Sequence, residues 1–119
     1  MPNVLAVDGR PSILAMIVDM LQESSYAVNT ASDGAEALEW MREHPTGVIL
    51  LDLELPLERE FLARLRHGSS WAGIPIVGMT THPLDSPASR LRPPTLLIKP
   101  FRRADLEQAL RRALAPQIH

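Results

Sequence analysis

Five short segments of the chain are rich in apolar residues, and stretches with a helical pattern separate them. Short continuous apolar runs are typical of parallel strands that are buried on both faces of a sheet. The second segment has the weakest pattern, with Val28 and Thr30 on one face. We expect strands at about residues 3–7, 26–31, 48–51, 75–80 and 96–98.

Apolar stripes with the spacing i, i+3, i+4, i+7, i+8 predict the first and last helices. The two stripes are Ile13, Met16, Ile17, Met20 and Leu21, and Leu106, Ala109, Leu110, Ala113 and Leu114. Ser32-Asp33-Gly34 is a start signal for a helix between them. Pro56 opens a further helix, and a loop is expected at residues 68–73. The apolar residues of these two middle helices are Ala35, Leu38 and Met41, and Phe61, Leu62 and Leu65.

The segment between Thr80 and Lys99 is rich in proline. It contains Pro83, Pro87, Pro93 and Pro94. A proline inside a helix costs about 3 kcal/mol or more, so a long helix is not expected there. Ser86 could cap a helix with Pro87 at its first position. We therefore expect a short or irregular fourth helix in residues 81–95.

The alternation of strands and helices predicts a single α/β domain over residues 1–119 with a parallel sheet. The chain has no cysteine, which excludes disulfides and thiolate metal sites. The net charge of −2 argues against direct binding to nucleic acid. No apolar stretch approaches the roughly 20 residues of a membrane span, and no signal peptide is evident. We expect a cytoplasmic protein without membrane insertion.

Four of the predicted strands end at a polar residue. Asp8 and Lys99 follow the first and last strands, Asp52 follows the third, and Thr80 ends the fourth. Lys99 is the only lysine among 12 Lys and Arg residues. Ligands of open α/β sheets bind beyond the carboxyl ends of the strands. Two carboxylates, a hydroxyl and an ammonium should therefore converge on one small pocket.

These residues match a known family in order along the chain. The matching segments are Val7-Asp8, residues 50–56, residues 74–80 and residues 98–101. Together they resemble the receiver domain of bacterial two-component response regulators over essentially the whole chain. The resemblance implies a flavodoxin-like (βα)5 three-layer sandwich with strand order 2-1-3-4-5. It also implies a signalling domain, not an enzyme, that accepts a phosphoryl group on one aspartate from a histidine kinase or phosphotransfer protein.

The resemblance assigns a role to each polar strand end. Asp52 corresponds to the phosphoacceptor, and Asp8 to one member of the acidic pair that holds Mg²⁺ together with Asp52. Glu54 corresponds to the position whose backbone carbonyl also meets the metal. Thr80 and Lys99 correspond to the hydroxyl and the lysine that contact the phosphoryl group, and the Lys99–Pro100 bond is a candidate cis peptide. The output partner is unknown.

Four features depart from the family pattern. Gly9 stands where the second acidic residue of the metal pair is expected, so Mg²⁺ affinity should fall. Arg10 or Glu54 could reach in to replace the lost function. Residues 57–60 lack the usual glycine-bearing turn, so the third helix could start early. Leu96 replaces an aromatic switch residue, and the proline-rich segment falls on the fourth helix.

Other classes of protein fit the sequence less well. A flavin-binding protein of the same fold needs a Ser/Thr/Gly-rich loop after the first strand, but residues 8–11 contain one glycine and a proline. A P-loop enzyme needs a glycine-rich loop that ends in Lys-Ser/Thr, but the only lysine, Lys99, lies elsewhere. An aspartyl-phosphate phosphatase needs an aspartate where Glu54 stands. The remaining alternative is a pseudo-receiver that is not phosphorylated and acts only as a protein-interaction module. Gly9 favours it, whereas Asp52, Thr80 and Lys99 favour a working phosphoacceptor.

The predicted last helix ends close to the end of the sequence. This favours a stand-alone receiver, and a receiver excised from a longer protein is the other expectation.

Overall fold

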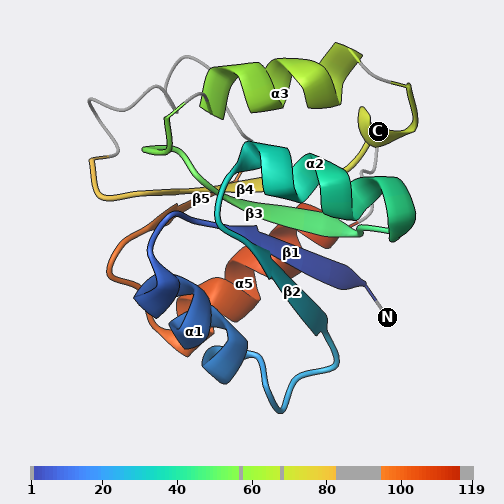
Figure 1. The fold of residues 1–119 in the computed structure, drawn as a ribbon. Coiled ribbons are helices and arrows are strands. Elements are labelled where there is room, and N and C mark those ends of the chain that lie inside the picture. The colour runs from blue at the N-terminus through green and yellow to red at the C-terminus, as the bar shows by residue number, and fades with distance from the viewer. Residues whose placement is uncertain (1, 57, 68, 83–94, 116–119) are drawn as a thin grey trace.

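Five parallel strands form one sheet in the order β2-β1-β3-β4-β5 (Figure 1). The strands are β1 (Asn3–Val7), β2 (Ala27–Ala31), β3 (Val48–Asp52), β4 (Ile76–Thr80) and β5 (Thr95–Ile98). The structure is a computed structural model that describes residues 2–56, 58–67, 69–82 and 95–115. The central strands β1, β3 and β4 are almost entirely buried, as their continuous apolar runs predict.

Helices cover both faces of the sheet and make a three-layer sandwich. They are α1 (Pro11–Met20), α2 (Gly34–Glu43), α3 (Glu58–His67) and α5 (Arg103–Leu114), with a 3₁₀ turn at Ser69–Trp71. Helices α1 and α5 lie on one face, and α2 and α3 lie on the other (Figure 1). The fold class and the strand order predicted from the sequence are confirmed.

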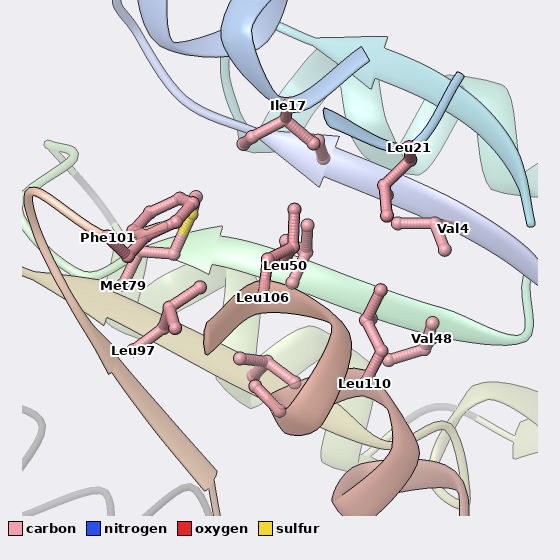
Figure 2. Close-up of a cluster of buried hydrophobic side chains, with 13 residues drawn as sticks. Val4, Ile17, Leu21, Val48, Leu50, Met79, Leu97, Phe101, Leu106 and Leu110 are labelled. Atoms are coloured by element: carbon pink, nitrogen blue, oxygen red, sulfur yellow. The ribbon is translucent and has the colours of Figure 1, made fainter. Parts of the chain in front are cut away.

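Side chains that alternate along the central strands β1, β3 and β4 enter two separate hydrophobic cores. Leu50 packs into the core under α1 and α5, whereas the adjacent Leu51 packs into the core under α2 and α3. Figure 2 shows the first core, in which Ile17 of α1, Leu21 directly after α1, and Leu106 and Leu110 of α5 point at the sheet. The predicted apolar stripes of both helices therefore face the sheet.

The strand register brings the polar strand ends to the same edge of the sheet. Val7, the last residue of β1, pairs with Leu51 of β3, so Asp8 and Asp52 follow neighbouring positions. Asp52 pairs with Met79 of β4, and Thr80 pairs with Ile98 of β5. The residues that complete this edge are therefore Asp8, Asp52, Thr80 and Lys99.

The local start signals are confirmed with small differences. Asp33 caps α2, and its carboxylate accepts a hydrogen bond from the amide of Glu36 at 2.8 Å. Helix α3 is described from Glu58, and part of the predicted loop at 68–73 forms a 3₁₀ turn. The predicted short fourth helix falls mostly in residues 83–94, which lie outside the described residues. In the described part of the chain, no helix is long and apolar enough to cross a membrane.

Candidate functional site

Lys99 joins the two acidic strand ends. Its Nζ lies 2.8 Å from Asp8 Oδ2 and 3.3 Å from Asp52 Oδ1. All three side chains are nearly closed to solvent, with 7 %, 0 % and 10 % of their surfaces exposed. One ammonium thus compensates two buried carboxylates, and the three groups carry a net charge of about −1 when ionised.

Backbone amides fix both carboxylates at the ends of their strands. The amide of Arg10 donates to Asp8 Oδ1 at 2.8 Å, and the amide of Glu54 donates to Asp52 Oδ1 at 3.0 Å. The backbone of Asp8 is also held, because its N–H donates to Ala31 of β2 at 3.1 Å. Each carboxylate is therefore positioned by the chain two residues further on.

The environment raises the pKa of Asp52 above its ordinary value. Burial is the largest cause, and the negative charge of Asp8 adds to it. The hydrogen bond from the Glu54 amide and the charge of Lys99 act in the opposite direction. A carboxylate so placed is a better nucleophile than a fully stabilised one, because less hydrogen bonding and charge pairing must be lost when it reacts.

Thr80 and Lys99 come from adjacent strands that are joined at this edge. The Lys99 amide donates to the Thr80 carbonyl at 2.9 Å, which fixes the start of the Lys99 side chain. Thr80 is fully buried, and its hydroxyl oxygen accepts a hydrogen bond from the His82 amide at 3.1 Å. The Lys99–Pro100 peptide bond is cis, as the resemblance implies.

Glu54 and Thr81 form a hydrogen bond at the rim of the site that the sequence did not predict. The Thr81 hydroxyl donates to Glu54 Oε2 at 2.6 Å, and both residues are exposed. This bond lowers the pKa of Glu54, and the charge of Lys99 contributes to the same effect. Glu54 is therefore ionised near neutral pH and lies within the field of the same lysine as Asp8 and Asp52.

Gly9 and Arg10 leave the metal side of the site without a third carboxylate. A Cβ atom on Gly9 would come close only to Leu55 Cδ2, at 3.2 Å. A small movement of the Leu55 side chain would make room for this atom. Arg10 is exposed and reaches Asp8 through its backbone amide. Among the described residues, no three acidic, histidine or cysteine side chains stand close enough together to hold a metal ion.

The residues present nevertheless fit a magnesium ion. Mg²⁺ prefers oxygen ligands and is held by one or two carboxylates together with waters. Asp8 and Asp52 provide two carboxylates that meet at one ammonium group, so their oxygens lie close to each other. Burial is the main cause of the raised pKa of Asp52, and the negative charge of Asp8 adds to it; a divalent cation would relieve this repulsion between the two carboxylates.

The position of the family's aromatic switch residue lies on the edge strand. Leu96 of β5 is 38 % exposed, and its neighbour on the same face, Ile98, is 50 % exposed. A leucine has no hydroxyl group, so it cannot form a hydrogen bond there. Any conformational readout at this position must therefore use packing alone.

Comparisons of sequence and structure agree on one family. The sequence model of the response regulator receiver domain matches residues 4–111. The transcriptional regulatory protein BaeR of Escherichia coli O6:H1 is 35% identical over 79 residues, which are 66% of this chain and 32% of BaeR. The sensor histidine kinase TmoS of Ectopseudomonas mendocina is 29% identical over 98% of this chain and 12% of its own length. The chain thus spans a third or less of these two relatives.

Solved structures give the same result. The chemotaxis protein CheY4 of Vibrio cholerae superposes with a TM-score of 0.84 and 35% identity, covering 96% of this chain and 99% of CheY4. The receiver domain of the sensor histidine kinase PA1611 of Pseudomonas aeruginosa PAO1 gives 0.85 and 26% identity, covering 97% and 98%. That structure has a magnesium ion coordinated in its active-site cleft.

The chain therefore belongs to the response regulator receiver domains of two-component systems. These are signalling domains that interact with histidine kinases or phosphotransfer proteins and generally bind Mg²⁺.

Proposed function

We propose that this receiver accepts a phosphoryl group on Asp52 from a histidine kinase or phosphotransfer protein, in the cytoplasm, and then binds an output partner differently. The observation that supports this most is the convergence of Asp8, Asp52 and Lys99 at one buried point, where Lys99 Nζ reaches both carboxylates. A pair of buried acids without a chemical role would be a costly arrangement.

The transfer needs an attacking oxygen and compensation of charge. Both contacts that the described residues make with the Asp52 carboxylate go to Oδ1, so Oδ2 is the oxygen that we expect to attack phosphorus. The bond between phosphorus and the imidazole nitrogen of the donor's phosphohistidine breaks as the acyl phosphate forms. The donor histidine is the leaving group. The product carries about two negative charges where Asp52 carried one. Lys99, already within reach, can pair with the new oxygens.

The proposal assigns the remaining contacts to neighbouring groups. Asp8, Asp52 and the Glu54 carbonyl would hold Mg²⁺, which supplies positive charge to the phosphoryl oxygens when it is bound. The Thr80 hydroxyl, which accepts a hydrogen bond from His82, keeps its own proton to donate to the phosphoryl group. Because Gly9 supplies no carboxylate, we expect Mg²⁺ to bind more weakly than it does to a site with a complete acidic pair.

A direct test is to incubate the chain with acetyl phosphate and Mg²⁺ and to measure the intact mass. We expect a phosphate-sized gain for the wild-type chain and none for Asp52→Ala. Asp33→Ala is a matched control, because it removes an exposed aspartate that caps α2 and leaves the site unchanged.

The absence of a mass gain at any Mg²⁺ concentration would contradict the proposal. It would favour the second candidate function, a pseudo-receiver that acts by protein binding alone. Gly9 is the observation that favours that candidate, because it removes a carboxylate from the metal side of the site.

A further inference from the structure

We propose that the side chain of Glu54, in addition to its backbone carbonyl, acts as the third carboxylate of the metal site and replaces the acidic residue that Gly9 lacks. This inference rests on the proposed function, because it concerns the same magnesium site. It gives Glu54 a role that its position in the family does not imply, since there only the main-chain oxygen meets the metal.

The two buried carboxylates already use part of their acceptor capacity, which is then not available to an ion. Asp8 Oδ1 accepts the Arg10 amide and its Oδ2 accepts Lys99, both at 2.8 Å. Asp52 Oδ1 accepts the Glu54 amide and also faces Lys99. Each of these contacts competes with a cation for the same lone pairs. A further anionic oxygen would therefore strengthen the site substantially.

Glu54 is an acidic residue whose backbone adjoins the site and whose side chain would supply that oxygen after a change of rotamer. Its amide donates to Asp52 Oδ1 at 3.0 Å, so its backbone lies directly beside the phosphoacceptor. The charge of Lys99 acts on Glu54 as it does on Asp52, which puts the Glu54 carboxylate in the electrostatic neighbourhood of the site. The side chain is exposed, so it can change rotamer without disturbing the core.

The hydrogen bond from Thr81 explains where the carboxylate rests when it does not bind an ion. Thr81 follows Thr80, the last residue of β4, and its hydroxyl holds Glu54 Oε2 at 2.6 Å. Thr81 therefore keeps Glu54 at the rim, next to the strand ends that surround Asp52. A single hydrogen bond between two exposed groups is a weak restraint, and a divalent cation can compete with it.

The experiment is a calorimetric titration of the full chain with Mg²⁺. Glu54→Gln keeps the size and the ability to accept from Thr81 but removes the charge. We expect it to weaken Mg²⁺ binding about tenfold or more. Glu60→Gln is the matched control: it removes the same charge from an exposed residue near the site, at the start of α3, and should have little effect.

A second arm tests whether Glu54 replaces the residue that is missing at position 9. Gly9→Asp restores a carboxylate there, and its Cβ atom meets closely only the flexible end of Leu55, at 3.2 Å. In this background we expect tighter Mg²⁺ binding and a much smaller effect of Glu54→Gln. An equal loss in both backgrounds would show a general effect of charge and would overturn the inference.

Two further results would also overturn it: Mg²⁺ binding to Glu54→Gln that equals that of Glu60→Gln, or no Mg²⁺ binding by the wild-type chain. The mass measurement on Asp52 separates this inference from the proposed function. If Asp52 is phosphorylated but Glu54→Gln binds Mg²⁺ normally, only the role of Glu54 fails. If Mg²⁺ binding depends on Glu54 but Asp52 gains no phosphate, the phosphoacceptor function fails and the ligand assignment stands.

Discussion

Lys99 is the residue on which the electrostatics of the site depend. It reaches two carboxylates that are almost completely buried, and its own side chain is only 7 % exposed. Removing one partner of a buried ionic group leaves the other charges uncompensated, which costs more than the pair contributes. The lysine is therefore expected to serve both the resting state and the phosphorylated state.

Substitution of Lys99 separates these two contributions. We expect Lys99→Ala to fold but to lose about 3 kcal/mol of stability at pH 7, because Asp8 and Asp52 then repel each other without compensation. Urea unfolding measures this loss. Phosphorylation of the wild-type chain should protect the β4 and β5 amides from hydrogen exchange. We expect Lys99→Ala to lose this protection. Lys99→Met keeps the alkyl stem and separates charge from packing. A wild-type response in Lys99→Ala would show that its assigned role is wrong.

Glu58 is a buried carboxyl group whose role differs from that of the strand-end acids. It is 7 % exposed at the first described turn of α3, and its Oε2 has no hydrogen-bond partner among the residues that the structure describes. Burial raises its pKa, and the charge of Arg59 offsets part of this effect. The folded protein therefore holds the Glu58 proton more tightly than the unfolded chain does.

This shift predicts a dependence of stability on pH. The contribution of Glu58 is fully present below its ordinary pKa of about 4.5 and is lost as the pH rises through the raised value. Glu58→Met removes the unsatisfied oxygen and should stabilise the protein by about 1–2 kcal/mol at pH 7.5, with a smaller gain at pH 4. Urea unfolding at both pH values measures this difference.

Glu60→Met serves as the control for Glu58→Met, because Glu60 lies in the same turn but is exposed. A gain for Glu58→Met that is the same at both pH values would show that Glu58 does not carry the titration.

At the scale of the elements, periodicity predicted most of the fold from the sequence. The apolar runs gave β3 and β4 to within a residue, and the stripes of α1 and α5 face the sheet as expected. These elements are predictable because their burial repeats over many residues, so that one atypical position does not change the pattern. The capping signal at Asp33 is equally local and is confirmed.

The predicted apolar stripe of α3 did not include Glu58, although this residue is buried. It lies three, four and seven positions before Phe61, Leu62 and Leu65, so it continues the buried stripe of α3. The spacing would have indicated its burial, but a charged residue at the start of a helix is usually taken to be exposed. Periodicity therefore carries information even where the residue type argues against it.

The contacts at the rim could not be predicted in the same way. The Glu54–Thr81 hydrogen bond joins residues 27 positions apart in two loops that follow β3 and β4. Strand order places these loops side by side, but side-chain rotamers decide whether the two groups meet. The resemblance likewise indicated which strand ends matter, whereas the shared contact of Lys99 with Asp8 and Asp52 required coordinates.

At the scale of the whole molecule, one sheet separates two hydrophobic cores and carries the site at its edge. The core beneath α1 and α5 and the core beneath α2 and α3 use alternate residues of the same strands (Figures 1 and 2). Leu50 and Leu51 are both fully buried, and they belong to opposite cores. Because the central strands β1, β3 and β4 contribute to both layers, loss of packing on one face should be felt on the other.

Truncation of either leucine tests this coupling. We expect Leu50→Ala and Leu51→Ala each to lower the free energy of unfolding by about 3 kcal/mol, since each leaves a cavity in a closed core. Both variants should still unfold in a single transition that is the same by far-UV circular dichroism and by tryptophan fluorescence, because Trp40 and Trp71 pack against the core of Leu51. If fluorescence changes first in Leu51→Ala, the α2–α3 layer unfolds independently. Asp8 and Asp52 lie at the ends of strands that both layers share. If the layers unfold independently, a change at Asp52 could not be passed to the whole molecule.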